Sequence, residues 1–161
     1  MARSSREQVK GREPDQGDPC RDHYLEPGAP RQVRDVIARH ADEMQKKRGV
    51  VGSGGPDCLS TQNDWADVFE SESIEAYRLG RTLDRGRGQE LGGFRVPGEA
   101  NPRDHHWLAV GPHFTLFDPT WGQFFREFGP PSLDRYVTDD GRPFPMWRHD
   151  ELQRHHSAGE G

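Results

Sequence analysis

Two short apolar runs separated by a turn constrain the fold of this chain more than any other feature. Residues 105–110 and 114–118 are rich in Trp, Val, Phe, Thr and Leu, and Gly111-Pro112-His113 lies between them. Runs of this length and composition around a Gly-Pro turn predict a β-hairpin. The first run begins with His105 and the second ends with Asp118. The hairpin therefore brings an imidazole close to a carboxylate.

The register of the hairpin decides which histidine meets Asp118. A two-residue loop at Gly111-Pro112 sets His105 opposite Asp118, whereas a three-residue loop sets His106 there. Because side chains alternate between the two faces of a strand, the two histidines must point to opposite sides of the sheet. The residues alone leave both registers open.

A cysteine precedes the hairpin at the expected start of a helix. The residues that recur at helical spacing are Cys58, Gln62, Trp65, Ala66 and Phe69. They form one inward-facing stripe, which predicts a helix over about 58–70 that continues or restarts through Ser73–Leu79. The dipole and free N–H groups of a first helical turn favour a thiolate and can also stabilise an oxyanion.

These residues resemble a known catalytic core. A cysteine at a helix start, followed by His105-His106-Trp107 on one strand and Asp118-Pro119-Thr120 on the next, resembles the transglutaminase-like and papain-like cysteine peptidase superfamily. The longer run from Asp118 to Phe124 is similar to the end of this core in small bacterial members. The resemblance extends from Gly54 to Phe124. It implies Cys58 as nucleophile, His105 as general base and Asp118 as the partner that orients the imidazole.

The resemblance also implies a reaction class. A Cys-His-Asp triad transfers an acyl group through a thioester, so the expected activity is that of an amide hydrolase or peptidase on a peptide, protein or small amide. One alternative is an amide-forming, transglutaminase-type or deamidase-type acyltransferase, in specialised metabolism or as a toxin domain. Another alternative is a binding module of the same fold in which Cys58 is buried and inert.

Other ligand classes fit the sequence less well. The histidines 105, 106 and 113 lack zinc-site spacings such as Cys-x-x-Cys or His-Glu-x-x-His. The glycine run at 52–55 lacks the Gly-Lys-Ser/Thr ending of a phosphate loop. The Arg- and Gly-rich stretch at 80–88 has no interleaved aromatic residues, and the net charge is −5. We therefore expect no metal, no cofactor and no nucleic-acid partner.

Composition limits the folded part of the chain. A length of 161 residues suits one domain, but 30% hydrophobic residues with 19 Gly and 13 Pro is lean. We expect disordered tails at 1–22 and 151–161 around one catalytic-type domain over 23–150. The sequence shows no apolar run of membrane-spanning or signal-peptide type, so we expect no membrane partner. Two cysteines do not suggest a disulfide framework, and a cytoplasmic location is expected.

The remaining elements complete the expected architecture. An apolar stripe that starts after Pro30 and ends in basic residues before Gly49 predicts a helix over 30–48. A strand is expected near 91–96, and a short helix or strand at 133–137. Helices that precede antiparallel strands predict an α+β domain in which the nucleophile helix packs on a small antiparallel sheet.

Overall fold

The computed structural model describes residues 23–48, 58–81, 92–122, 132–138 and 140–160. The expected N-terminal tail at 1–22, the glycine run at 52–55 and most of the Arg- and Gly-rich stretch lie outside these residues.

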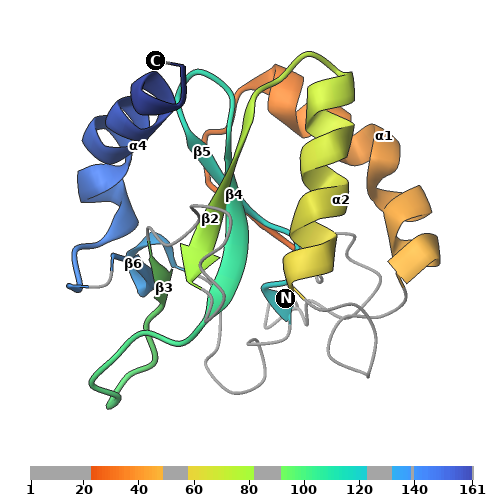
Figure 1. Cartoon of the computed structure of the whole chain (residues 1–161). Coiled ribbons are helices and arrows are strands. Elements are labelled where there is room, and N and C mark those ends of the chain that lie inside the picture. The colour runs from red at the N-terminus through yellow and green to blue at the C-terminus, as the bar shows by residue number, and fades with distance from the viewer. Residues whose placement is uncertain (1–22, 49–57, 82–91, 123–131, 139, 161) are drawn as a thin grey trace, which may run out of the picture.

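The described elements form an α+β fold with a small antiparallel sheet (Figure 1). In chain order they are β1 (Tyr24–Leu25), α1 (Arg31–Arg48), α2 (Cys58–Ser71), β2 (Ala76–Arg81), β3 (Gly93–Phe94), β4 (His105–Val110), β5 (Thr115–Asp118), a 3-10 turn η2 (Leu133–Arg135), β6 (Tyr136–Val137) and α4 (Phe144–Glu160). None of the described helices is both long and apolar enough to cross a bilayer.

The two helices expected from periodicity are confirmed. Helix α1 follows Pro30 directly, and α2 begins at Cys58 and ends at Ser71. The α2 stripe faces inward as expected, because Gln62, Trp65, Ala66 and Phe69 are buried. Cys58, at the N-terminal end of the stripe, is half-buried. The 3.6-residue period therefore identified which side of α2 is buried.

The segment after α2 corrects the sequence interpretation. Residues 73–79 were expected to continue the helix, but Ala76–Arg81 forms strand β2. Ser73 adopts a positive φ of 65°, a conformation that ends α2. The chain then pairs antiparallel with β4, with Ala76 level with Val110 and Leu79 level with Trp107. Tertiary pairing thus outweighs a local sequence that is compatible with a helix.

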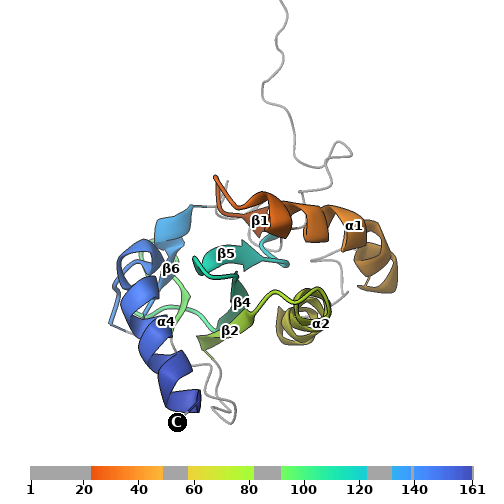
Figure 2. The same ribbon diagram turned by 90° about the horizontal axis from the view of Figure 1, so that it is seen from above.

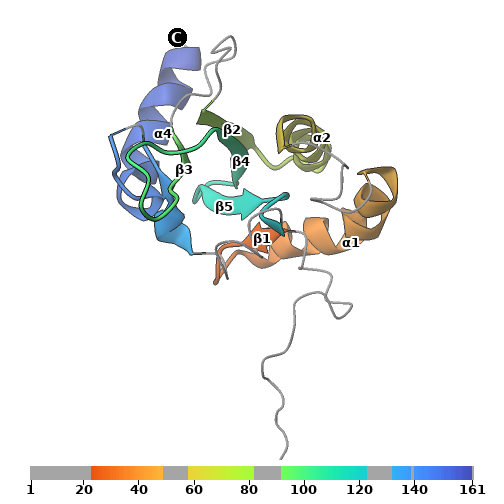
Figure 3. The same ribbon diagram turned by 90° about the horizontal axis from the view of Figure 1, so that it is seen from below.

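The four-stranded sheet has the order β1-β5-β4-β2, and a separate pair joins β3 to β6. Viewed from above and from below, β4 and β5 lie between α1 and α2 on one side and β3, β6 and α4 on the other (Figures 2 and 3). Every residue of β4 and β5 is buried. Successive residues of these strands therefore contribute to two separate cores.

The two cores differ in composition. The core beside α1 and α2, called here the N-terminal core, consists of Val33, Val36, Ile37, Met44, Trp65, Ala66, Phe69, Ile74, Leu108, Val110 and Phe117. The core beside β6 and α4, called here the C-terminal core, consists of Leu79, Phe94, Val96, Trp107, Ala109, Phe114, Leu116, Tyr136, Phe144, Trp147 and Leu152. Aromatic side chains make up a larger share of the second core.

The C-terminal segment departs from the expected tail. A boundary at residue 150 is wrong, because α4 continues to Glu160 and Leu152 is fully buried. Trp147 on the same helix is also fully buried. The expected short element at 133–137 is present as η2 followed by β6. Tyr136, Phe144, Trp147 and Leu152 therefore tie this part of the chain to the core.

Candidate functional site

Cys58 is the first residue of α2, and Gln62 lies one turn later on the same face. The Gln62 side chain donates from Nε2 to the carbonyl oxygens of Leu79 and Trp107, each at 2.7 Å. These two residues lie opposite one another on β2 and β4. Gln62 therefore fixes the start of α2 against both strands. Periodicity placed Gln62 on the inward face, but its role as a double donor was not foreseen.

A close approach between β2 and β4 lies beside the site. Gly80 is level with His106 and has a φ of +136°. A Cβ at this position would lie 2.0 Å from the carbonyl oxygen of His105. Only glycine fits there without pushing apart the two strands.

The predicted partnership of His105 and Asp118 is present in the structure. The Nε2 atom of His105 lies 2.8 Å from Oδ2 of Asp118, and both side chains are buried. His105 is the first residue of β4 and Asp118 is the last of β5. The two groups therefore meet at one end of the sheet.

The register that produces this pair was not one of the two expected. Val110 is level with Thr115 and Leu108 with Phe117, so a four-residue turn at 111–114 joins the strands. One step further along, Trp107 is level with Asp118, and His105 reaches the carboxylate diagonally on the same face. An even loop length keeps His105 on the Asp118 face, as the two-residue loop would have done.

The other histidines are held apart from the carboxylate. By strand alternation His106 shares the face of Leu108, which packs in the N-terminal core. His113 is an exposed residue of the turn at the far end of β4. In the part of the chain that the structure describes, no three His, Cys, Asp or Glu side chains are grouped to hold a metal ion.

The structure brings Cys58 to the same imidazole. Burial alone would lower the pKa of His105, but the charge and hydrogen bond of Asp118 and the hydrogen bond of the Cys58 side chain raise it from 6.5 to about 9. The ring is consequently protonated at neutral pH. An imidazolium between a sulfur atom and a buried carboxylate is suited to activating a nucleophile.

Asp118 accepts further hydrogen bonds from Tyr136 and Thr120. The hydroxyl of Tyr136 donates to Oδ2 at 2.6 Å, and the backbone N–H of Thr120 donates to Oδ1 at 3.0 Å. Thr120 belongs to the Asp-Pro-Thr motif, whereas Tyr136 lies beyond the segment that resembles the superfamily. No pattern in the sequence linked Tyr136 to the site.

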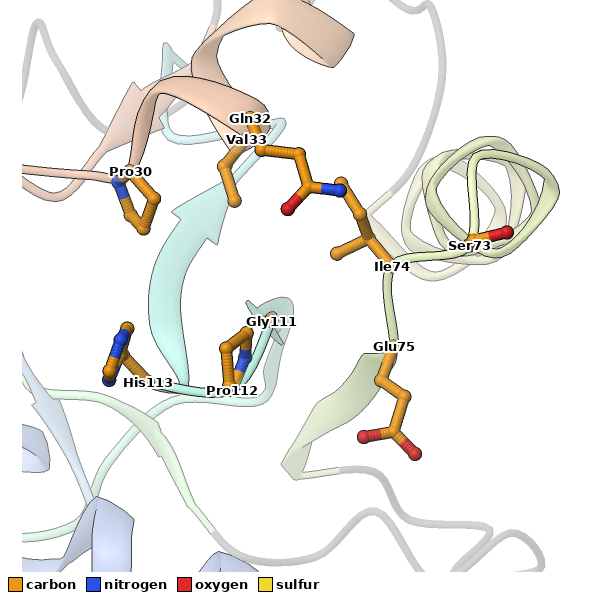
Figure 4. A pocket seen from close by; sticks show the side chains of 9 residues that line it. All are labelled: Pro30, Gln32, Val33, Ser73, Ile74, Glu75, Gly111, Pro112 and His113. Atoms are coloured by element: carbon orange, nitrogen blue, oxygen red, sulfur yellow. The ribbon is translucent and has the colours of Figure 1, made fainter.

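The hollow drawn in Figure 4 lies elsewhere. It has a volume of about 280 Å³ and lies where the start of α1, the end of α2 and the β4–β5 turn meet. Its lining includes Val33, Ile74 and Pro112, and Figure 4 shows Gln32 and Glu75 on the α1 and α2 sides. Since β4 runs away from His105 toward this turn, the hollow is at the opposite end of the strand from the cysteine and the carboxylate.

No family model, curated protein or solved structure matches this chain. The contacts among Cys58, His105, Asp118 and Tyr136 are therefore the observations on which a function can be based.

Proposed function

We propose that this protein is a cysteine-dependent acyl-transfer enzyme with a papain-like or transglutaminase-like core. The observation that carries the proposal is the position of the His105 ring, which contacts the Cys58 side chain and the buried Asp118 carboxylate. The residues and their chain order are those of the resemblance described above. A buried cysteine of purely structural role would not require a protonated imidazole and an ionised carboxylate behind it.

The chemistry follows from these contacts. The sulfur of Cys58, as thiolate, attacks the carbonyl carbon of an amide, and the leaving amine takes a proton from His105 as the carbon–nitrogen bond breaks. A thioester on Cys58 remains. Water or an amine then gives a proton to His105 and attacks the thioester, which releases the acyl product and the thiolate. Throughout, Asp118 holds the imidazole in place and stabilises its positive form.

The first test measures the reactivity of Cys58. In a Cys20→Ser background Cys58 is the only thiol, and we expect iodoacetamide to alkylate it at pH 6 at least about tenfold faster than a free cysteine. His105→Asn should abolish this advantage, and the matched change His106→Asn on the opposite face should preserve it. Circular dichroism melts verify that each variant is folded. Alkylation that requires denaturant would overturn the proposal and favour the inert binding module.

The second part of the test detects the acyl-enzyme. With p-nitrophenyl acetate we expect a burst of nitrophenolate and a mass increase of one acetyl group on Cys58. Cys58→Ser in the same background should show neither signal. Addition of a primary amine then separates hydrolysis from amide formation, because an amine acceptor gives an acetylated amine instead of acetate. Absence of both the burst and the acetylated protein would contradict an acyl-transfer function.

A further inference from the structure

The carboxylate of Asp118 is held at both oxygens. Its Oδ2 atom lies 2.8 Å from Nε2 of His105 and also accepts the hydroxyl of Tyr136 at 2.6 Å. Its Oδ1 atom accepts the backbone N–H of Thr120 at 3.0 Å, with the Thr120 hydroxyl at 3.4 Å. The carboxylate therefore cannot rotate without breaking contacts on both sides.

Tyr136 is rigid and remains a donor. It is fully buried, and its ring packs against Trp107 at 5.1 Å and Phe94 at 5.4 Å between centroids. Burial, followed by the charge and hydrogen bond of Asp118, raises the pKa of Tyr136 well above its ordinary value. The phenol consequently keeps its proton and donates a hydrogen bond to the carboxylate across the neutral pH range. A buried tyrosine hydroxyl needs such an acceptor.

We propose that Tyr136 is a positioning residue of the site, acting through Asp118 on His105. This inference rests on the proposed function and adds to it a residue outside the segment that resembles the superfamily. The hydroxyl of Tyr136 fixes the rotation of the carboxylate, and the carboxylate in turn fixes the orientation of the His105 ring. It also takes up part of the negative charge on Oδ2, the oxygen that His105 contacts.

Because His105 and Tyr136 share Oδ2 of Asp118, loss of the tyrosine hydroxyl should change how tightly His105 holds its proton. If the Tyr136 hydroxyl is removed, His105 remains as the side-chain donor to Oδ2 among the described residues and is bound more tightly in its protonated form. A more tightly held proton is passed less readily to a leaving group. The pKa of His105 should therefore rise when the hydroxyl is lost.

Ionisable groups of several elements act on this pair. His105 interacts with Asp118 of β5 and Cys58 of α2. Tyr136 interacts in addition with Tyr24 of β1 and with Arg135, the residue that precedes it. Tyr24 offers a matched control because its ring stacks on that of Tyr136 at 6.4 Å with an interplanar angle of 5°. Among the described hydrogen bonds, none joins its hydroxyl to Asp118.

The experiment compares Tyr136→Phe with Tyr24→Phe, both in the full chain with Cys20→Ser. The His105 ring is followed by NMR with labelled histidine and assigned through His105→Asn. We expect Tyr136→Phe to raise the pKa of His105 by about half a unit or more, and Tyr24→Phe to move it by less than about 0.2 unit. In an Asp118→Asn background, Tyr136→Phe should cause no further shift, because the residue between them no longer carries charge. A merely structural role for the hydroxyl would change the melting temperature without moving this titration.

The outcomes separate the two proposals. An unmoved His105 titration in Tyr136→Phe, an equal shift in Tyr24→Phe, or a shift that persists with Asp118→Asn would overturn the role of Tyr136. If wild-type Cys58 is nevertheless alkylated rapidly, the proposed acyl-transfer function stands. Slow alkylation of folded wild-type protein overturns the proposed function, whatever the titration shows.

Discussion

The two faces of the four-stranded sheet contribute different things to the candidate site. The N-terminal face, under α1 and α2, supplies Cys58 at a half-buried helix start. The C-terminal face, under β3, β6 and α4, covers His105 and Asp118 and supplies the hydroxyl of Tyr136. One side thus provides a half-buried thiol, and the other provides the buried surroundings that set the charge state of His105. Reactivity in such a site depends on both layers being in place.

The largest expected effect concerns α4, which we expect to be required for the stability of the C-terminal core. Trp147 is fully buried in the C-terminal core, where it packs on Phe144 at 5.2 Å between ring centroids. We expect Trp147→Ala to lower the free energy of unfolding by roughly 3 to 5 kcal/mol, as is usual for a large buried aromatic residue. Urea titrations followed by circular dichroism measure the change. The neighbouring Met146 is 72% exposed, and Met146→Ala should stay within about 0.5 kcal/mol. Equal effects of the two changes on the free energy of unfolding would mean that α4 does not pack on the core.

The electrostatic part of the comparison can be tested by pH. The pKa of folded His105 is about 9, above the ordinary 6.5. Between these values the folded state holds a proton that the unfolded state has lost, so stability is full below pH 6.5 and falls as the pH rises through 9. The loss should amount to about 3 kcal/mol, since each unit of pKa corresponds to about 1.4 kcal/mol.

Urea titrations at several pH values measure this slope. Asp118→Asn should flatten it because the ion pair is gone, while His113→Asn at the exposed turn should leave it unchanged. A slope that survives Asp118→Asn would mean that another group controls stability in this range, and that the C-terminal face does not set the charge state of His105.

The smallest expected effect concerns the N-terminal face. Gln62 joins α2 to two strands through Leu79 and Trp107. Gln62→Met keeps the length of the side chain but removes both hydrogen bonds, and we expect a loss of about 1 to 2 kcal/mol together with slower alkylation of Cys58. Asn63→Ala is the matched control on the same helix, because its amide only accepts from Arg78 near the surface. If Gln62→Met costs stability but leaves alkylation unchanged, Gln62 supports the fold and not the position of the thiol.

The parts of this architecture that follow from local pattern could be predicted from the sequence. An apolar stripe at helical spacing predicts α1 and α2, and apolar runs around a Gly-Pro turn predict β4 and β5. The same patterns singled out Cys58, Asp118 and the two histidines 105 and 106, and the resemblance to the superfamily implied His105. The structure brings His105 together with Asp118 and Cys58.

Two incorrect expectations have a common physical origin. The hairpin loop is longer than expected because Phe114 takes a φ of 52°, and the region after α2 is a strand because Ser73 takes a φ of 65°. An aromatic residue or a serine gives little sign of a left-handed backbone, which usually falls to glycine or asparagine. Positive φ at such positions is imposed by tertiary packing and is not visible in local sequence.

The contact between Tyr136 and Asp118 was beyond prediction for a different reason. The two residues come from separate sheets, and neither is distinguished by spacing from the other buried residues around it. The helix α4 was more accessible to inference, because Phe144, Trp147 and Leu152 lie at helical intervals among polar residues. The many polar residues around these three positions obscured their helical spacing.

The way in which Asp118 is surrounded also sets the order in which the site can be built. Its backbone is level with Tyr24 on β1, and its side chain meets His105 on β4 and Tyr136 on β6. Contacts between such distant parts of a chain form late in folding, and a chain made from its N-terminus exposes the thiol and the imidazole well before Tyr136 emerges. During synthesis, then, Cys58, His105 and Asp118 all leave the ribosome before the tyrosine that completes the surroundings of the carboxylate.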